Sequence, residues 1–286
     1  MTSPALLRRA AIAAALSLAA AAHAQSVPLE DPGFTDAITE QFRSALPDEH
    51  VVVVAPQRLT IGNTGAVVSL ARLWQACHAT PARCDDTAAD FVAGSVKAFQ
   101  EMNRPPERAQ VRVALRSSAT AQAYLAQSRG TGLNLQVQPF VGGIVSAVVI
   151  DSPRTVRWAS SHDLESLQLD SAALLALARA NTRAAMQPLM SVAPPAPKGK
   201  VGALEGDAYA ASRLLFTPDW APLAKAQGGV LIIAVPRPTV ILYVGDDSAE
   251  SVAALRAFAH ERFQRAPDPV SETLLRWTPD GWKTLP

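Results

Sequence analysis

Hydrophobic and polar residues follow one another along this chain in periods that change from segment to segment, and each period predicts an element. Ile38, Phe42 and Leu46 recur at four-residue intervals, as on one face of an amphipathic helix over residues 34–46. Four consecutive valines at 51–54 are typical of a buried strand, because β-branched apolar side chains pack well in a sheet. We expect residues 57–61 to pair with this strand.

Further along the chain, the same patterns predict more helices and strands. Residues 67–77 and 86–102 are expected to form two helices that meet near Cys77 and Cys84. Later helices are predicted at 118–127 and, behind the capping residue Asp170, up to residue 186. Strands are predicted at 111–115, 133–140, 144–150, 155–158, 230–235, 239–244, 273–277 and 282–285.

The strands of the second half indicate the fold class. Residues 230–235 and 239–244 are apolar at almost every position, so we expect them in the middle of a sheet, covered on both faces. The last two strands flank Pro279-Asp280-Gly281 and are typical of a β-hairpin. The elements together predict an α/β (α+β) fold: a mixed, largely antiparallel sheet flanked by helices, with a C-terminal β-hairpin.

The chain is expected to divide at a proline-rich stretch, residues 193–200, whose composition is typical of a semi-rigid linker. This stretch separates an N-terminal α/β lobe, residues 25–192, from a C-terminal α/β lobe, residues 201–286. Because the strands of the C-terminal lobe are too apolar to face water, we expect this lobe to pack on the first.

The first 24 residues have the pattern of a secretory signal peptide. Arg8 and Arg9 precede an uncharged, alanine-rich stretch, and Ala22-His23-Ala24 closes the segment with the small residues that signal peptidases require. We expect cleavage after Ala24 and a mature chain, starting at Gln25, that is periplasmic or secreted. The sequence leaves open which export route is used, although most of the twin-arginine motif is missing.

Composition excludes several classes of protein. With 49% hydrophobic residues among 286, the chain has enough apolar material for a folded core, which excludes a disordered protein. Its 26 basic and 25 acidic residues leave a charge of +1, and removal of the leader brings this near −1. A nucleic-acid partner is therefore not expected. Stable membrane insertion is not expected either, because no later apolar run reaches membrane length.

Cys77 and Cys84 are the only cysteines. An oxidising compartment favours a disulfide between them. The alternatives are a metal site that includes His78 and a redox pair, but zinc ligands and redox cysteines usually have other spacings. We expect a structural disulfide at the corner between the two helices, and neither a metal nor a cofactor.

Residues 144–286 carry a distinctive series of short motifs. A strand that ends in Asp151-Ser152-Pro153 is followed by Ala180-Asn181, by the run Gly-Asp-Ala-Tyr-Ala-Ala-Ser-Arg-Leu-Leu at 206–215, by Val235-Pro236 and by Ser271. In this series the chain resembles the YtpQ-like family of uncharacterised bacterial proteins. The family typically carries a polar run ending in aspartate after that proline, where this chain has Arg237-Pro238-Thr239. The resemblance implies a mixed α/β fold and brings no established reaction.

The common catalytic signatures are absent from the sequence, including the phosphate-binding loops, G-x-S-x-G and H-E-x-x-H. Ser160-Ser161-His162-Asp163 contains the residue types of a catalytic triad. Neighbours in sequence rarely reach triad geometry, however, so a helix N-cap is the simpler interpretation of His162 and its neighbours.

Four other polar residues are candidates for a site. Asp151 and Asp207 could act as a carboxylate pair, with Ser212 nearby, whereas each aspartate alone is more typical of a turn or cap. Asn181 is predicted on the buried face of its helix, where an amide needs hydrogen-bond partners. We favour a core amide for Asn181 over a ligand contact.

The sequence therefore favours a non-catalytic module that binds a periplasmic protein or a small ligand. The alternative is a hydrolase that uses Asp151, Asp207, Ser212 or His162. The two hypotheses differ in whether these groups converge in one open pocket.

Overall fold

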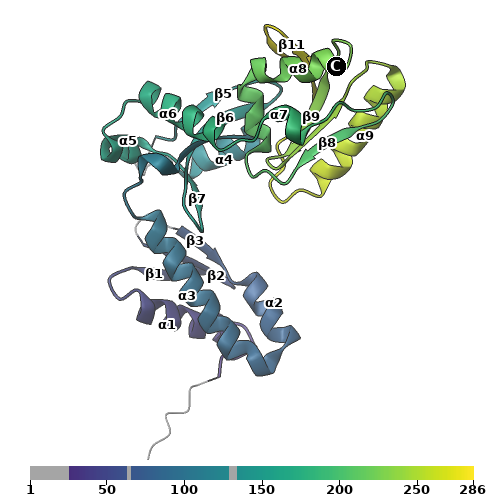
Figure 1. Cartoon of the computed structure of the whole chain (residues 1–286). Coiled ribbons are helices and arrows are strands. Elements are labelled where there is room, and N and C mark those ends of the chain that lie inside the picture. The colour runs from purple at the N-terminus through teal and green to yellow at the C-terminus, as the bar shows by residue number, and fades with distance from the viewer. Residues whose placement is uncertain (1–25, 63–65, 129–133) are drawn as a thin grey trace, which may run out of the picture. The chain divides into compact units, whose positions relative to one another are not determined.

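The computed structural model of the chain describes residues 26–62, 66–128 and 134–286 (Figure 1). The expected signal peptide and the first residue of the strand predicted at 133–140 lie outside the described residues. The chain forms two compact units that divide at Gly94: unit 1 precedes this boundary, and unit 2 comprises Ser95–Pro286. Both units combine helices with antiparallel sheets, as the hydrophobic pattern predicts.

Unit 1 is built on a three-stranded antiparallel sheet in the order β1-β2-β3. Phe34, Ile38 and Phe42 line one face of α1 and are fully buried, and Phe42 meets Phe91 of α3 edge to face at 6.4 Å. This amphipathic helix confirms the four-residue period. The elements are α1 (Gly33–Ala45), β1 (Val51–Ala55), β2 (Arg58–Ile61), β3 (Ala66–Ser69), α2 (Ala71–Ala79), η1 (Pro81–Arg83) and the first part of α3 (Cys84–Met102), which crosses the boundary after Gly94.

Two predictions for unit 1 are wrong. Strand β1 forms where four valines predict it, but only Val51 is buried, because Val52 and Val54 lie on the sheet face opposite that of the buried Leu59. Residues 67–69, expected in the helix 67–77, belong instead to strand β3 and pair with β2, so that helix α2 begins only at Ala71. Because Val67 and Val68 favour strands, local propensity agrees with the structure at this position.

The disulfide between Cys77 and Cys84 is present and joins the end of α2 to the start of α3. Both cysteines are buried. The bond therefore pins the corner between the two helices, as the spacing and the expected compartment predict.

Unit 2 contains two antiparallel sheets. The first has the order β4-β6-β5, with β7 also paired to β6, and the second has the order β12-β11-β9-β10-β8. Strands β9 and β10 lie inside the second sheet and are buried on both faces, and β11 and β12 form the predicted C-terminal hairpin. The strands are β4 (Val111–Ser117), β5 (Val137–Pro139), β6 (Ile144–Asp151), β7 (Val156–Trp158), β8 (Gly202–Glu205), β9 (Ile232–Arg237), β10 (Val240–Val244), β11 (Ser271–Thr278) and β12 (Gly281–Leu285).

Helices cover these sheets. Helix α6 packs on β4 and β6 of the first sheet, where Leu174 and Ala178 join the main core. Helix α9 packs on the second sheet through Leu255 and Ala259, which belong to a separate, smaller core. The helical segments are η2 (Arg108–Gln110), α4 (Ser118–Gln127), α5 (Ser161–Leu167), α6 (Ser171–Ala184), α7 (Leu189–Val192), η3 (Ala210–Leu215), η4 (Thr217–Trp220), α8 (Ala221–Ala226) and α9 (Ala249–Gln264).

The boundary between the two units lies after Gly94 and not at the proline-rich stretch, residues 193–200. The main core of unit 2 includes Val113 and Ile150 from the first sheet together with Ile233 and Tyr243 from the second. Residues 193–200 pack within this unit: Ala193 is fully buried, and the Tyr243 hydroxyl donates to the Pro194 carbonyl at 2.7 Å. Residues 95–286 therefore form one unit, which differs from the expected lobes 25–192 and 201–286.

Candidate functional site

The Ser160-Ser161-His162-Asp163 segment begins helix α5. The Asp163 carboxylate accepts hydrogen bonds from the Ser160 backbone N–H and hydroxyl at 2.9 and 3.1 Å. The Arg157 guanidinium donates to both oxygens of the same carboxylate, at 2.6 and 2.7 Å. Asp163 therefore faces Arg157, and His162 lies exposed on the helix. This is the helix cap that the simpler interpretation predicts.

The electrostatics of Asp163 agree with this structural role. Burial raises the pKa of Asp163, but the hydrogen bonds from Arg157 and Ser160 outweigh it and hold the pKa below its usual range. The carboxylate is thus ionised and bound by its own neighbours. It does not orient an imidazole toward a serine.

Asn181 and Thr182 cover the free edge of strand β4. The Asn181 amide donates to the carbonyls of Val111 and Arg108 at 3.0 and 2.8 Å. The Thr182 hydroxyl accepts from the Val113 N–H at 2.9 Å and donates to the Ala178 carbonyl. Asn181 is half-buried, although we expected it on the buried face of its helix. The buried polar residue of α6 is its neighbour Thr182. Both side chains bind backbone groups.

Asp207 fixes the loop that leads into η3. Its carboxylate accepts from the Tyr209 backbone N–H at 2.8 Å and from the Arg213 guanidinium at 3.0 Å. Arg213 is buried, and its other nitrogen donates to the Gln187 carbonyl at 2.8 Å. Ser212 is buried in the same turn. The pair thus ties η3 to the segment after α6.

Asp151 ends strand β6 and lies near the side chain of Tyr209. Burial, followed by the neighbouring Asp151 carboxylate, raises the pKa of the Tyr209 hydroxyl. Tyr209 therefore lies near both candidate aspartates, because its backbone N–H donates to Asp207 and its hydroxyl is near Asp151. His162 and Asn181 belong to other elements, α5 and α6.

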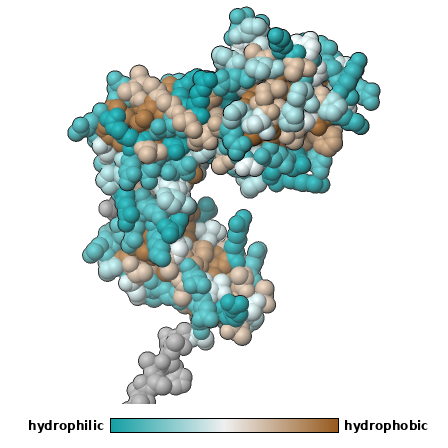
Figure 2. Space-filling model, viewed as in Figure 1, coloured by the Kyte–Doolittle hydropathy of each residue, from teal (hydrophilic) through white to brown (hydrophobic). Residues whose placement is uncertain are grey.

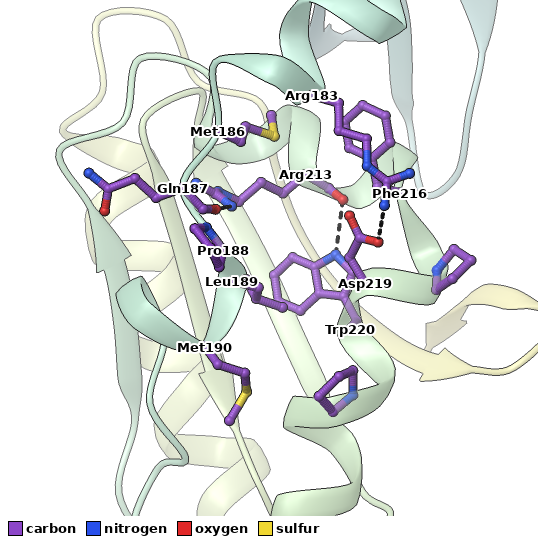
Figure 3. Close-up of a pocket in the computed structure, with 12 residues that line it drawn as sticks. Arg183, Met186, Gln187, Pro188, Leu189, Met190, Arg213, Phe216, Asp219 and Trp220 are labelled. Carbon is purple, nitrogen blue, oxygen red and sulfur yellow. Dashed lines mark hydrogen bonds and ion pairs between the residues drawn. The ribbon is translucent and has the colours of Figure 1, made fainter.

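A pocket of about 480 Å³ lies beside Arg213, the partner of Asp207. It is formed by the segment after α6 and the η3–η4–α8 region (Figure 3). Arg213 lines the pocket, while Asp151, Asn181, Asp207, Ser212 and His162 are not among its lining residues. The lining residues are Arg183, Met186, Gln187, Pro188, Leu189, Met190, Arg213, Phe216, Pro218, Asp219, Trp220 and Pro222.

The polar groups of this pocket bind one another. Arg183 pairs with Asp219 at 2.6 Å and stacks over the ring of Phe216 at 5.4 Å (Figure 3). The Trp220 indole N–H donates to the Arg213 carbonyl at 2.9 Å. Methionine and proline side chains form much of the remaining wall, and Met190 is 40% exposed. The arrangement is suited to an apolar ligand group and offers no paired nucleophile and base.

Sequence reasoning did not single out this pocket. Arg213 belongs to the run at 206–215, yet its pairing with Asp207 depends on the 3-10 turn between them. The one local signal is Met186-Gln187-Pro188-Leu189-Met190, a methionine- and proline-containing segment directly after a helix. Flexible methionines are common at surfaces that adapt to ligands.

In the part of the chain that the structure describes, no group of three or more His, Cys, Asp or Glu side chains could hold a metal ion. Within the same residues, no helix is both long enough and apolar enough to cross a bilayer.

Comparisons of this chain with family models, with curated proteins and with solved structures find no match. The resemblance to the YtpQ-like family therefore stays a prediction.

Proposed function

We propose that this chain is an exported binding protein without a catalytic role, and that the pocket beside Arg213 receives an apolar ligand or apolar side chains of a protein. The observation that carries the proposal is the pocket lining. Its charged groups are paired within unit 2, which leaves methionine and proline side chains as the surface that a ligand can contact.

The hydrolase alternative has less support. The Asp207 carboxylate is held by Arg213 and by the Tyr209 backbone, and Asp163 is held by Arg157 and Ser160. A general base needs a free lone pair directed at the substrate. Both carboxylates are instead held by donors of their own unit, and neither lines the pocket beside Arg213.

Binding can be tested with phenylnaphthylamine, a neutral apolar dye whose fluorescence rises in an apolar environment. We expect saturable binding to the mature chain, and binding about tenfold weaker in Met190→Glu, since the substitution places a charge in the pocket. Phe258→Glu is the matched control, because Phe258 is 50% exposed on α9, in the same unit but outside the pocket lining. Equal loss in both variants, or no saturable binding, would contradict the proposal.

Export is supported by two features: the signal-peptide pattern of residues 1–24 and the disulfide, which is typical of oxidising compartments. Expression of the full chain in a bacterial host that secretes proteins should yield a periplasmic product that starts at Gln25 and has no free thiol. Amino-terminal sequencing checks this, and a product that retains Met1 in the cytoplasm would contradict export.

A further inference from the structure

Among the residues that the structure describes, strand β1 of unit 1 pairs with β2 alone, so its other edge carries no further strand. The Gly62 N–H donates to the His50 carbonyl at 2.9 Å. This bond shows which residues of β1 direct their backbone groups toward β2 and which direct them away. In an antiparallel pair the bonded residues alternate, so Val52 faces β2 while Val51 and Val53 point their N–H and C=O groups away from it. Arg43 donates to the Val51 carbonyl at 3.2 Å. The backbone N–H and C=O of Val53 lie two residues further along the same edge.

A groove of about 500 Å³ runs past Val53. It lies between the end of β1 and the start of α1, and it is lined by Asp31, Pro32, Thr35, Asp36, Val53, Val54, Ala55 and Pro56. Val53 and Val54 are 39% and 53% exposed, although valine favours burial. Hydrophobic residues reach the surface of each unit (Figure 2), but here they adjoin an open strand edge.

The wall of the groove is held in place by hydrogen bonds. Thr35 is buried in α1, and its hydroxyl donates to Asp31 at 2.7 Å and accepts from the Gln57 N–H at 3.1 Å. The Gln57 side chain donates to the other Asp31 oxygen at 3.0 Å. These bonds tie the start of α1 to the β1–β2 turn, so the groove is formed before any ligand arrives.

The charge of unit 1 indicates what the groove can bind. Residues 26–94 contain nine acidic and four basic residues, a formal charge of −5, while residues 95–286 contain 16 acidic and 20 basic residues, a charge of +4. Asp36 is exposed, and no ion pair among the described residues includes it. An acidic groove beside an apolar strand edge complements a basic, extended peptide.

We propose that the groove between α1 and β1 binds an extended basic segment of a partner protein, which pairs with β1 as an added strand and places a lysine or arginine near Asp36. Edge pairing at Val53 supplies backbone hydrogen bonds, and the exposed valines contact the alternate side chains of the peptide. A second copy of unit 1 is a poorer occupant, because two units of charge −5 repel each other.

The test uses the mature full-length chain and two synthetic hexapeptides, Lys-Val-Thr-Val-Lys-Val and Glu-Val-Thr-Val-Glu-Val, with binding measured by calorimetry at low salt. We expect saturable binding of the lysine peptide alone. Val53→Pro removes the outward N–H and should weaken binding about tenfold, since proline is tolerated on edge strands but cannot donate. Asp36→Asn should weaken binding about threefold at low salt and less at high salt.

Two further variants keep the test decisive if Val53→Pro fails to fold. Val54→Lys adds a cation to the groove and should weaken binding of the lysine peptide at least about threefold. Val67→Lys is the matched control: Val67 is 56% exposed on β3, the opposite edge strand of the same sheet, and this variant should bind as the parent does.

Three results would overturn the proposal. The first is the absence of saturable binding of the lysine peptide. The second is an equal effect of Val54→Lys and Val67→Lys, which would show that net charge, and not the groove, determines binding. The third is a dimer in sedimentation that Val53→Pro dissociates, which would identify a second copy as the occupant of β1.

Discussion

Strands β1 and β4 are both edge strands, but they differ in how far side chains bind the backbone groups of their outer edges. At β4, Thr182 binds the outward N–H of Val113, and Asn181 binds the outward carbonyl of Val111. At β1, Arg43 reaches the Val51 carbonyl, but Val53 lies in an open groove. An uncovered edge invites pairing with another chain, and proteins usually block it. The difference indicates that the β4 edge is closed for stability and the β1 edge is open for a partner.

The same contrast holds for the charged groups of the two units. In unit 2, Asp207 and Asp163 are bound by arginines of their own unit, and the charge of this unit is positive. Unit 1 is acidic, and Asp36 lies exposed at its groove. Sequence motifs drew attention to the aspartates of unit 2, which hold the fold together. The groove proposed to bind a basic peptide lies in unit 1, whereas the pocket beside Arg213 in unit 2 offers apolar side chains.

The largest effect on stability is expected at the buried ion pair of unit 2. Asp207→Ala leaves the buried Arg213 guanidinium without its carboxylate and should lower the free energy of unfolding by about 3 kcal/mol. Asp219→Ala breaks the more exposed pair with Arg183 and should cost at most about 1 kcal/mol. Urea unfolding measures both. Equal costs would show that burial of Arg213 does not determine the effect.

The disulfide should stabilise unit 1 by a similar amount. Replacement of Cys77 and Cys84 by alanine frees a short loop in the unfolded chain and should cost about 2.5 kcal/mol. Hydrogen exchange can locate the loss: amides of α1 and β2 should lose protection, while those of β9 and β10 should keep theirs. Uniform loss in both units would mean that the two units unfold together.

Opening the closed edge is expected to cost slightly less. Thr182→Val keeps the shape of the side chain but leaves the Val113 N–H without an acceptor, which should destabilise the chain by about 2 kcal/mol. Thr182→Ser retains the hydroxyl and serves as the control. Exchange of the Val113 amide should accelerate in the valine variant only. Unchanged exchange there would show that Thr182 does not protect this edge.

Acidification should weaken unit 2 through Asp163. Because the folded chain lowers the pKa of Asp163 below the ordinary value of 3.8, its stabilisation is fully present above that pH. It is lost as the pH falls through the lower pKa of the folded state. Asp163→Asn should therefore flatten the acid limb of the stability profile, as measured by urea unfolding from pH 5 downward. An unchanged profile would contradict the role of the Arg157 pair.

The smallest effects are expected at the open edge. Val54→Lys and Val67→Lys replace exposed side chains and should each change the free energy of unfolding by less than about 0.5 kcal/mol. If Val54→Lys proved as costly as a core substitution, Val54 would be buried in solution, and β1 would be covered without added peptide.

The fold was predictable where period and burial coincide. The stripe of Ile38 and Phe42 and the apolar runs of β9 and β10 led to the observed elements. The valines of β1 did not indicate their own exposure, because propensity identifies a strand but not its place in the sheet. Likewise, prolines at 193–200 suggest a linker, but contacts such as Tyr243 with Pro194 join residues far apart in sequence.

The candidate residues show the same limit. The capping role of Asp163 was predictable from Ser160, three positions earlier, because the capping box is local. The edge-covering role of Asn181 requires β4, about 70 residues away. Neither the Arg213 pocket nor the β1 groove has a continuous sequence signature, since helices, turns and strands contribute to each.

The most direct test compares the amide hydrogen exchange of Val53 and Val113, two valines whose N–H groups point outward from edge strands. In the free mature chain, the Val113 amide should be protected by the Thr182 hydroxyl, and the Val53 amide should exchange close to the rate of an unstructured peptide. Addition of the lysine hexapeptide should slow Val53 and leave Val113 unchanged. Equal protection of the two amides before any peptide is added would contradict the claim that one edge is closed and the other is open.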